Sequence, residues 1–276
     1  MNFTISTIVE NTISASLIPF AEHGLSFLIT AGNKKILFDS GKGQAFLPNA
    51  DAMNINLTEI ETVVLSHGHF DHANGLKELM SRNKNFKVIA HPAIFDNKLA
   101  GIGGTYFPIG ISETRENFEK NGIKFQLSKE SVEIIPGIIT TGEIPMESEF
   151  EEVEPMFFTG EKGKEVRDYI PDDLALIIDT KKGLVVLLGC AHRGIINTLN
   201  HVSKLTGKKK IHAIMGGLHL LFADQSKLKK ISDLLKGFEL EKLIIGHCTG
   251  IHAIVTLFNE FKDKVVLNTV GHTIQF

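Results

Sequence analysis

The chain has 276 residues, 43% hydrophobic and 22% charged, a composition typical of a globular protein with a substantial core. Its formal net charge of -3 argues against nonspecific nucleic-acid binding as the main activity. No stretch of about eighteen apolar residues is present, and Met1–Ile5 lacks the basic start of a signal peptide, so we expect a cytoplasmic protein without a membrane span. No linker-like segment interrupts the chain, which predicts one domain over residues 1–276.

The first third of the chain alternates strands with one helix. Alternating apolar and polar residues predict antiparallel strands over Phe3–Glu10, Leu25–Thr30 and Lys35–Asp39. The β-branched run Thr62–Leu65 predicts a buried strand, and Ala73–Met80 has apolar residues at helical spacing. The segment between this strand and this helix is the most informative part of the sequence.

Four ligand-type side chains are concentrated there in six residues: His67, His69, Asp71 and His72. Neutral imidazole is the commonest side-chain ligand for zinc and similar ions, and several ligands must converge to hold an ion. His67 and His69 lie two residues apart and can point the same way as the chain leaves the sheet. Asp71 and His72 follow on the turn into the helix. The stretch thus offers two half-sites and predicts two metal ions side by side.

Two segments in the middle of the chain are predicted to be loops, one rich in glycine and one rich in acidic residues. Phe86–Ala90 predicts a strand that ends at His91. The stretch Gly101–Gly110 lacks the lysine and hydroxyl residue of a phosphate-binding loop and is expected to be mobile. Glu143–Ile170 carries nine acidic residues together with aromatic ones, and we expect it to cover the substrate. Substrate specificity should reside in these two loops.

The second half repeats a strand, a ligand-bearing loop and a helix. Strands are predicted over Leu174–Asp179, Leu184–Leu188, Ile211–Met215, Leu243–Ile245 and Val265–Val270, and helices over Ile195–Leu205, Leu228–Phe238 and Ile251–Phe261. The first two strands are expected to form a hairpin. Three of the strand ends present further histidines: His192, His219 and His247.

The motif His-x-His-x-Asp-His after a strand resembles the signature of the metallo-β-lactamase superfamily. This resemblance implies a four-layer αββα fold, with two central mixed sheets flanked by helices, and one or two divalent ions, zinc first and iron, manganese or nickel as alternatives. The metal ligands it implies include the four motif residues and His247, which would join Asp71 and His72. Asp39, at the end of a strand and followed by x-Gly, would orient a ligand histidine.

The remaining ligands depart from the family pattern. Gly189-Cys190-Ala191-His192 stands where many members have Gly-Asp. Either His192 completes the first site with His67 and His69, or Cys190 takes the bridging position as a thiolate. We favour His192, and we assign substrate contact or proton transfer to His219. The other histidines lack a ligand-type neighbour and are expected to be structural: His23, His91, His201, His212, His252 and His272.

Three longer motifs resemble one prokaryotic branch of the superfamily: Gly-Cys-Ala-His-x-Gly-Ile, Gly-Gly-Leu-His-Leu and Gly-His-Cys-Thr-Gly. The branch includes metal-dependent hydrolases, which implies a metal-bound hydroxide attacking an ester, lactone or phosphoester of a small molecule. Asp71 would collect the proton of the water and His219 would protonate the leaving group.

The same branch implies two alternatives to hydrolysis. It contains an archaeal synthase that joins a pterin methyl diphosphate to an aminobenzene ribofuranosyl phosphate, so a transferase of this kind is the first alternative. An iron-binding redox or sensing protein is the second, although such members carry Glu at the position of His69. The partner expected in every case is a small molecule, and a homo-oligomer is left open.

Overall fold

The computed structural model describes residues 3–14 and 20–276. The chain forms two compact units: unit 1 contains Met1–Lys129, Val153–Asp172 and Thr269–Phe276, and unit 2 contains Glu130–Glu152 and Asp173–Asn268. The chain therefore passes from unit 1 into unit 2 twice and returns to unit 1 twice. Because neither unit is one continuous segment, no linker marks their boundaries in the sequence.

Unit 1 is built on a seven-stranded sheet. In spatial order its strands are β18 (Thr273–Gln275), β1 (Phe3–Val9), β2 (Ser26–Ala31), β3 (Lys34–Phe38), β4 (Ile60–Val64), β5 (Lys87–Ala90) and β8 (Lys124–Leu127). The antiparallel pairing predicted for the first three strands of the chain is confirmed. Strands β3, β4, β5 and β8 run parallel, so their carboxyl ends meet at one edge of the sheet.

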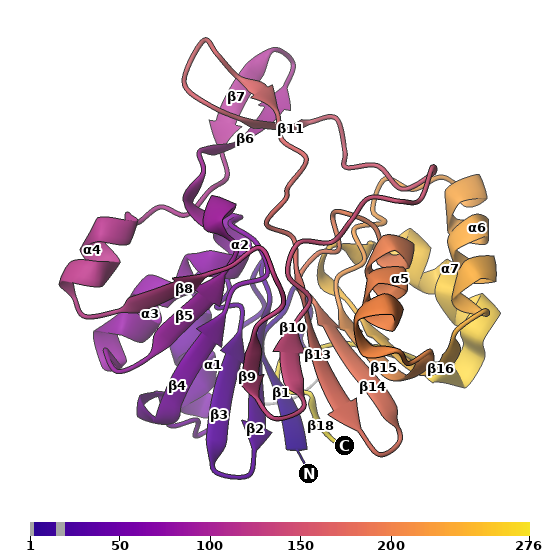
Figure 1. The fold of residues 1–276 in the computed structure, drawn as a ribbon, viewed down its shortest axis with the longest axis horizontal. Helices are drawn as coiled ribbons and strands as arrows, with labels where there is room; N and C mark the ends of the chain where they lie inside the picture. Colours follow the sequence, from indigo (N-terminus) through magenta and orange to yellow (C-terminus); the bar gives the residue numbers. More distant parts are fainter. Residues whose placement is uncertain (1–2, 15–19) are drawn as a thin grey trace. The chain divides into compact units, whose positions relative to one another are not determined.

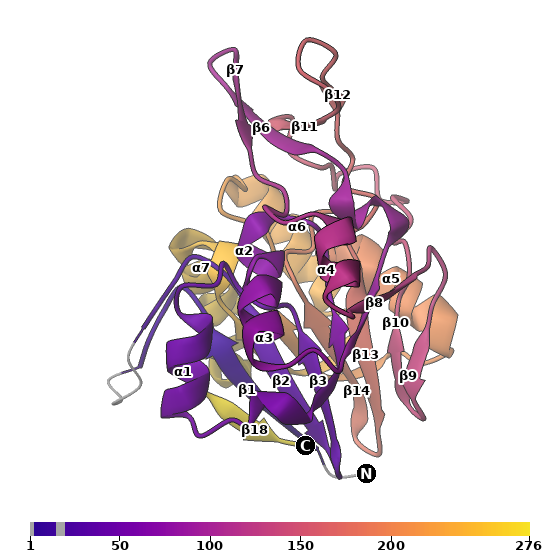
Figure 2. The same ribbon diagram turned by 90° about the vertical axis from the view of Figure 1, so that its left-hand side faces the viewer.

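Short helices cover this sheet. They are α1 (Phe46–Ala52), α2 (Phe70–Ala73), α3 (Gly75–Arg82) and α4 (Arg115–Lys120), with 3-10 turns η1 (Leu57–Glu59) and η2 (Pro92–Phe95). Figure 2 shows α1 and α3 side by side in front of the sheet. Phe46 of α1 and Leu76 and Leu79 of α3 are fully buried against the apolar side chains of the strands. Burial of this apolar surface attaches the helices to the sheet.

A second, four-stranded sheet of unit 1 corrects the prediction of a mobile loop at Gly101–Gly110. Its order is β12 (Val166–Arg167), β11 (Phe157–Thr159), β6 (Lys98–Ile102) and β7 (Thr105–Pro108). Gly103 and Gly104, with φ of 58° and 80°, make the tight turn between β6 and β7, so the glycines mark a hairpin. Strands β11 and β12 lie within Glu143–Ile170, which is therefore not wholly loop (Figure 2).

Unit 2 has a seven-stranded sheet of its own. Its order is β17 (Val265–Leu267), β16 (Glu239–Ile245), β15 (Lys210–Gly216), β14 (Gly183–Leu188), β13 (Ala175–Thr180), β10 (Ile138–Thr140) and β9 (Glu133–Ile135). The predicted β13–β14 hairpin is confirmed, and β14 to β17 run parallel. The carboxyl ends of β14, β15 and β16 therefore lie next to one another.

Three amphipathic helices accompany this sheet, as the helical periodicity predicts. They are α5 (Ile195–Thr206), α6 (Gln225–Leu235) and α7 (Ile251–Phe261), with 3-10 turns η3 (His247–Thr249) and η4 (Lys262–Lys264). Figure 1 shows them beside β13 to β16, and their buried residues share one apolar core with those strands. Among the helices of residues 3–14 and 20–276, none is long and apolar enough to cross a membrane.

Candidate metal centre

Asp39 organises the strand ends of unit 1. It follows β3 in the left-handed region, with φ of 59°, a strained conformation for a residue other than glycine. Its Oδ1 accepts a hydrogen bond from the Ser66 amide at 2.7 Å, and its Oδ2 accepts one from the Ser66 hydroxyl at 2.7 Å. The same Oδ2 lies 2.8 Å from Nδ1 of His72. Asp39 thus ties the end of β3 to both ends of the histidine motif.

His67 and His69 direct one nitrogen each towards the same point. Nδ1 of His67 lies 2.9 Å from the Ser66 hydroxyl, which turns Nε2 of His67 to within 3.0 Å of Nδ1 of His69. Two nitrogens bound to one zinc ion at 2.0–2.1 Å with a tetrahedral angle are about 3.3 Å apart. The observed distance of 3.0 Å between these two nitrogens therefore fits the binding of both to one ion.

Asp71 and His72 form a neighbouring group, to which the structure adds His23. Oδ2 of Asp71 lies 3.6 Å from Nε2 of His72 and 3.3 Å from Nε2 of His23. The side chain of His23 is 57% exposed, whereas that of Asp71 is 9% exposed. His23 is one of the histidines predicted to be structural, but its ring nitrogen lies beside the carboxylate of a predicted ligand.

Both neighbours of His23 are anchored. The Glu22 carboxylate accepts hydrogen bonds from three backbone amides, those of Lys42, Gly43 and Ala45, at 2.8–3.0 Å. On the other side, a Cβ at Gly24 would lie 2.6 Å from the carbonyl oxygen of Asp71, so only glycine allows this close approach. His23 is therefore held beside Asp71 by the backbone despite its exposure.

A buried ion pair fixes the loop between His67 and His69. The Gly68 amide donates a 2.7 Å hydrogen bond to Oδ2 of Asp172, whose Oδ1 lies 2.6 Å from Nζ of Lys98. Asp168 is a second partner of Lys98, at 3.2 Å. Burial lowers the pKa of Lys98, but the charges of Asp172 and Asp168 raise it by more, so the pKa lies above its ordinary value.

The strand ends of unit 2 carry the second set of predicted residues. Cys190 and His192 follow β14, His219 follows β15 and His247 follows β16. His219 and His247 have φ of 46° and 49°, and Ala191, between Cys190 and His192, has φ of 56°. All three strand ends thus use a left-handed non-glycine residue, a conformation that is costly and concentrates at functional sites.

Within unit 2 these residues converge in two overlapping groups. The ligand atoms of Cys190, His192 and His219 all lie within 4.8 Å of one another, and so do those of Cys190, His247 and Cys248. Burial raises the pKa of the Cys248 thiol, but hydrogen bonding with Cys190 and His219 and the charge of His247 lower it more. The pKa of this thiol is therefore well below the ordinary thiol value.

A buried glutamate supports the loop that carries Cys190 and His192. The Glu151 carboxylate accepts the amides of Ile196 and Asn197 at 2.9 Å and 2.8 Å, in the first turn of α5. Such a carboxylate replaces the missing intrahelical partners of a helix N-terminus. Burial raises the pKa of Glu151, and the backbone hydrogen bonds offset only part of this increase.

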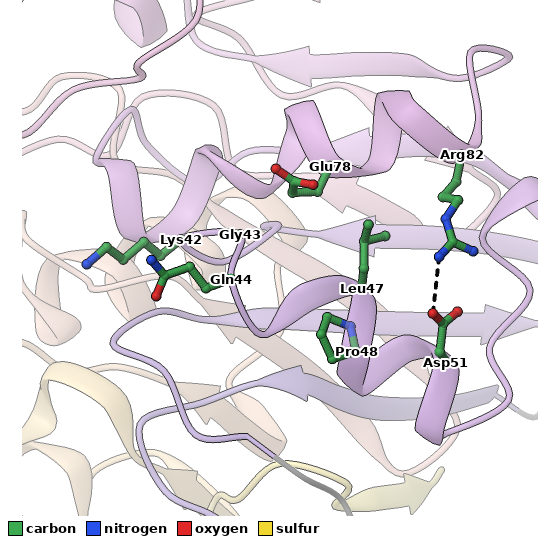
Figure 3. Close-up of a pocket in the computed structure, with 8 residues that line it drawn as sticks. All are labelled: Lys42, Gly43, Gln44, Leu47, Pro48, Asp51, Glu78 and Arg82. Atoms are coloured by element: carbon green, nitrogen blue, oxygen red, sulfur yellow. Dashed lines mark hydrogen bonds and ion pairs between the residues drawn. The ribbon is translucent and has the colours of Figure 1, made fainter.

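Two surface cavities of unit 1 are both lined in part by Lys42. One of about 320 Å³ is lined by residues that include His23, Glu22 and Lys42. The other, of about 600 Å³, contains the Asp51–Arg82 ion pair at 3.2 Å, and Figure 3 shows Lys42 pointing away from that pair. The smaller cavity is lined by both His23 and the positively charged Lys42, so it is the better candidate for substrate contact.

Sequence reasoning missed several of these supporting residues. Asp172 contacts the motif from a distant part of the chain, 104 residues from Gly68, and Lys98 holds Asp172 in place. Neither belongs to a spaced motif, so no local signal was available. Glu151 stood out only as one of many acids in its segment. For His23 the available signal was the Glu22-His23-Gly24 triplet, in which a glycine follows two polar residues.

Comparisons with known proteins identify the family of this chain. Residues 20–203 match the family description "Metallo-beta-lactamase superfamily". The 7,8-dihydropterin-6-methyl-4-(beta-D-ribofuranosyl)-aminobenzene-5'-phosphate synthase of Methanocaldococcus jannaschii is 34% identical over 285 residues, covering 100% of this chain and 97% of the relative.

Solved structures are similar as well. Tm1679, described as a metal-dependent hydrolase of the beta-lactamase superfamily, has a TM-score of 0.85 and 28% identity, covering 99% of this chain and 98% of that one. Zn(2+)-bound PqqB from Methylobacterium extorquens, with a TM-score of 0.58, 13% identity and 99% coverage of both chains, shares the fold. The predicted fold class, a mixed α/β protein with sheets flanked by helices, is confirmed.

Proposed function

Because the chain belongs to the metallo-β-lactamase superfamily, we propose that it is a metal-dependent hydrolase acting on an ester, lactone or phosphoester of a small molecule. One or two divalent ions, zinc above all, would be held by the predicted ligands His67, His69, Asp71, His72, His192 and His247. The observation that carries the proposal is the 3.0 Å approach of Nε2 of His67 to Nδ1 of His69.

The proposed chemistry divides between the ion and the side chains. When bound, a divalent ion supplies Lewis acidity, which acidifies water and polarises the oxygen of the bond under attack. Asp71 would orient the attacking water and accept its proton at Oδ2. His219 would donate a proton to the leaving group. Lys42, in the cavity with His23, would attract an anionic part of the substrate.

A second candidate function is favoured by one specific comparison. The synthase of Methanocaldococcus jannaschii is similar to this chain over its whole length. As a transferase, the protein would use the same ions to bind a diphosphate leaving group, and an aromatic amine or its ring carbon would take the place of water. The two reactions differ in the acceptor, so they can be distinguished by the requirement for the amine.

The test combines metal analysis with two assays. Wild type, His69→Ala and the exposed control His252→Ala would be assayed for bound metal, for hydrolysis of a phosphodiester and a lactone, and for consumption of a pterin methyl diphosphate with and without an aminobenzene ribofuranosyl phosphate. Hydrolysis that is lost only in His69→Ala supports the hydrolase. Pterin consumption that requires the amine supports the transferase. Full activity of His69→Ala in both assays would refute both proposals.

A further inference from the structure

The fold brings together the two cysteines of the chain, Cys190 and Cys248. Cys190 follows β14 and Cys248 follows β16, and these strands are separated in the sheet by β15. Nevertheless, Sγ of Cys248 lies 3.8 Å from the carbonyl oxygen of Cys190, so the two loops meet beyond the end of the intervening strand.

Two glycines at the end of β15 make this approach feasible. A Cβ at Gly217 would lie 2.5 Å from Sγ of Cys248 and 2.7 Å from the carbonyl oxygen of Gly189. A Cβ at Gly216 would overlap the carbonyl oxygen of Leu188. The strand between the cysteines thus ends without side chains, and Sγ of Cys248 occupies the space where one would stand.

The donor atoms around the cysteines have the spacing of a metal site. Sγ of Cys190, Sγ of Cys248 and a ring nitrogen of His247 all lie within 4.8 Å of one another. Zinc binds thiolate sulfur at about 2.3 Å and imidazole nitrogen at about 2.0 Å, so tetrahedral ligands are about 3.5–3.8 Å apart. Small side-chain rotations would bring these three donors to one ion.

Burial and backbone conformation favour a built site over a chance encounter. Cys190 is 3% exposed and His247 is 8% exposed, so these two donors are largely protected from water, and Cys248 is half-buried. His247 has φ of 49°, which directs the chain so that it and Cys248 both lie at the end of β16.

We propose that Cys190 and Cys248 are thiolate ligands of a soft divalent cation, with His247 as the third ligand. This inference extends the proposed function and rests on it in one respect, that His247 is a metal ligand. Two sulfur donors select zinc, cobalt or cadmium over magnesium and manganese, which prefer oxygen. The protein would therefore discriminate among metals through unit 2.

Cobalt absorption tests the ligand set independently of activity. The metal-free full-length protein would be titrated with Co²⁺ alone, while cobalt binding is measured by equilibrium dialysis. Any sulfur-to-cobalt charge-transfer band in the near ultraviolet must come from Cys190 or Cys248, since the chain has 2 cysteines. We expect such a band in the wild type and in His252→Ala, at about half intensity in Cys248→Ser, and none in the double variant Cys190→Ser/Cys248→Ser.

The outcomes separate this inference from the proposed function. Cobalt that binds to the wild type without a sulfur band overturns the thiolate site and leaves the metal-dependent function standing. No bound cobalt at all overturns both. A Cys190–Cys248 disulfide in protein purified under reducing conditions, detected by mass spectrometry without reductant, also overturns the thiolate site. The cobalt spectrum of the wild type alone tests the thiolate site, so the test still holds if a serine variant fails to fold.

Discussion

Asp39 Oδ2 lies 2.8 Å from His72 Nδ1, and neither side chain is exposed to solvent. This contact leaves Nε2 of His72 as the ring nitrogen that lies 3.6 Å from Asp71. The carboxylate of Asp39 also accepts two hydrogen bonds from Ser66, so its position is set by the backbone of the motif. A partner of this kind fixes the orientation of a ligand histidine.

Replacing Asp39 should therefore weaken metal binding without removing a ligand. Asp39→Asn presents an amide to His72 and to the Ser66 hydroxyl in place of one acceptor oxygen. We expect the affinity for zinc to fall by about 10–100-fold, measured by competition with a chelating dye. Asp51→Asn, a surface carboxylate paired with Arg82, is the matched control. Equal affinities of Asp39→Asn and wild type would show that the contact does not support the site.

His23 offers a test of a residue that touches a predicted ligand from the solvent side. His23→Ala removes the ring that lies 3.3 Å from Asp71. We expect kcat to fall by about 10-fold or more, because the orientation of the proton-accepting carboxylate is lost. The free energy of unfolding should change by less than about 1 kcal/mol, since the ring is exposed. His252→Ala should change neither quantity, and an active His23→Ala enzyme would exclude a role in the reaction.

The Lys98–Asp172 pair predicts a large effect on stability. The side chains are 1% and 0% exposed, so removing one charge leaves the other buried and uncompensated. Lys98→Met should reduce the free energy of unfolding by about 3–5 kcal/mol, measured by urea denaturation. The double variant Lys98→Met/Asp172→Asn should recover part of this loss. If Lys98→Met reduces the free energy of unfolding by less than about 1 kcal/mol, water reaches the Lys98–Asp172 pair.

The same pair predicts the direction of a pH dependence. The pKa of Lys98 is raised in the folded protein, so the folded state holds the proton more tightly than the unfolded chain. Its stabilisation is fully present below the unfolded pKa of about 10.4 and is lost as the pH rises through the folded pKa. The difference in stability between wild type and Lys98→Met should accordingly narrow above about pH 10.4. A constant difference would contradict the raised pKa.

Glu151 predicts a pH dependence of the same sign, in the acidic range. Its pKa is raised by burial, so the folded state binds its proton at a pH where the unfolded chain has released it. Stability from this group is present at low pH and is lost as the pH rises from the unfolded pKa of about 4.3 through the folded pKa. Wild type should gain stability relative to Glu151→Gln between neutral pH and about pH 4.3, measured by thermal denaturation at each pH. If wild type instead loses stability relative to Glu151→Gln over this pH range, the pKa of Glu151 is not raised in the folded protein.

Local patterns were sufficient for the regular elements. The apolar periodicities of β13, β14, α5 and α7 match their observed positions to within a few residues, because each element buries one face against the core of unit 2. The hairpin of β6 and β7 escaped prediction because its stability depends on β11, about sixty residues later in the sequence, which no local signal connects to it.

The candidate site, too, was predictable from local sequence only in part. The grouping of the four predicted ligands between His67 and His72 follows from their spacing, since His67 and His69 are two residues apart at a strand end and Asp71 and His72 follow on the turn into the helix. Asp172 contacts this motif only because the chain returns to unit 1 after Glu152, and the route of the chain is not encoded in the residues around it. Cys248 was visible in the sequence, but its approach to Cys190 depends on the missing side chains of Gly216 and Gly217.

Lys98 is also the first residue of β6, so the exposed hairpin and the histidine loop share an anchor. Strand β11 pairs with β6, and Asp168 and Asp172 follow shortly after this strand. The contacts run from the hairpin through Lys98 and Asp172 to the Gly68 amide. The ion pair that begins the hairpin is thus also the support of the loop between His67 and His69.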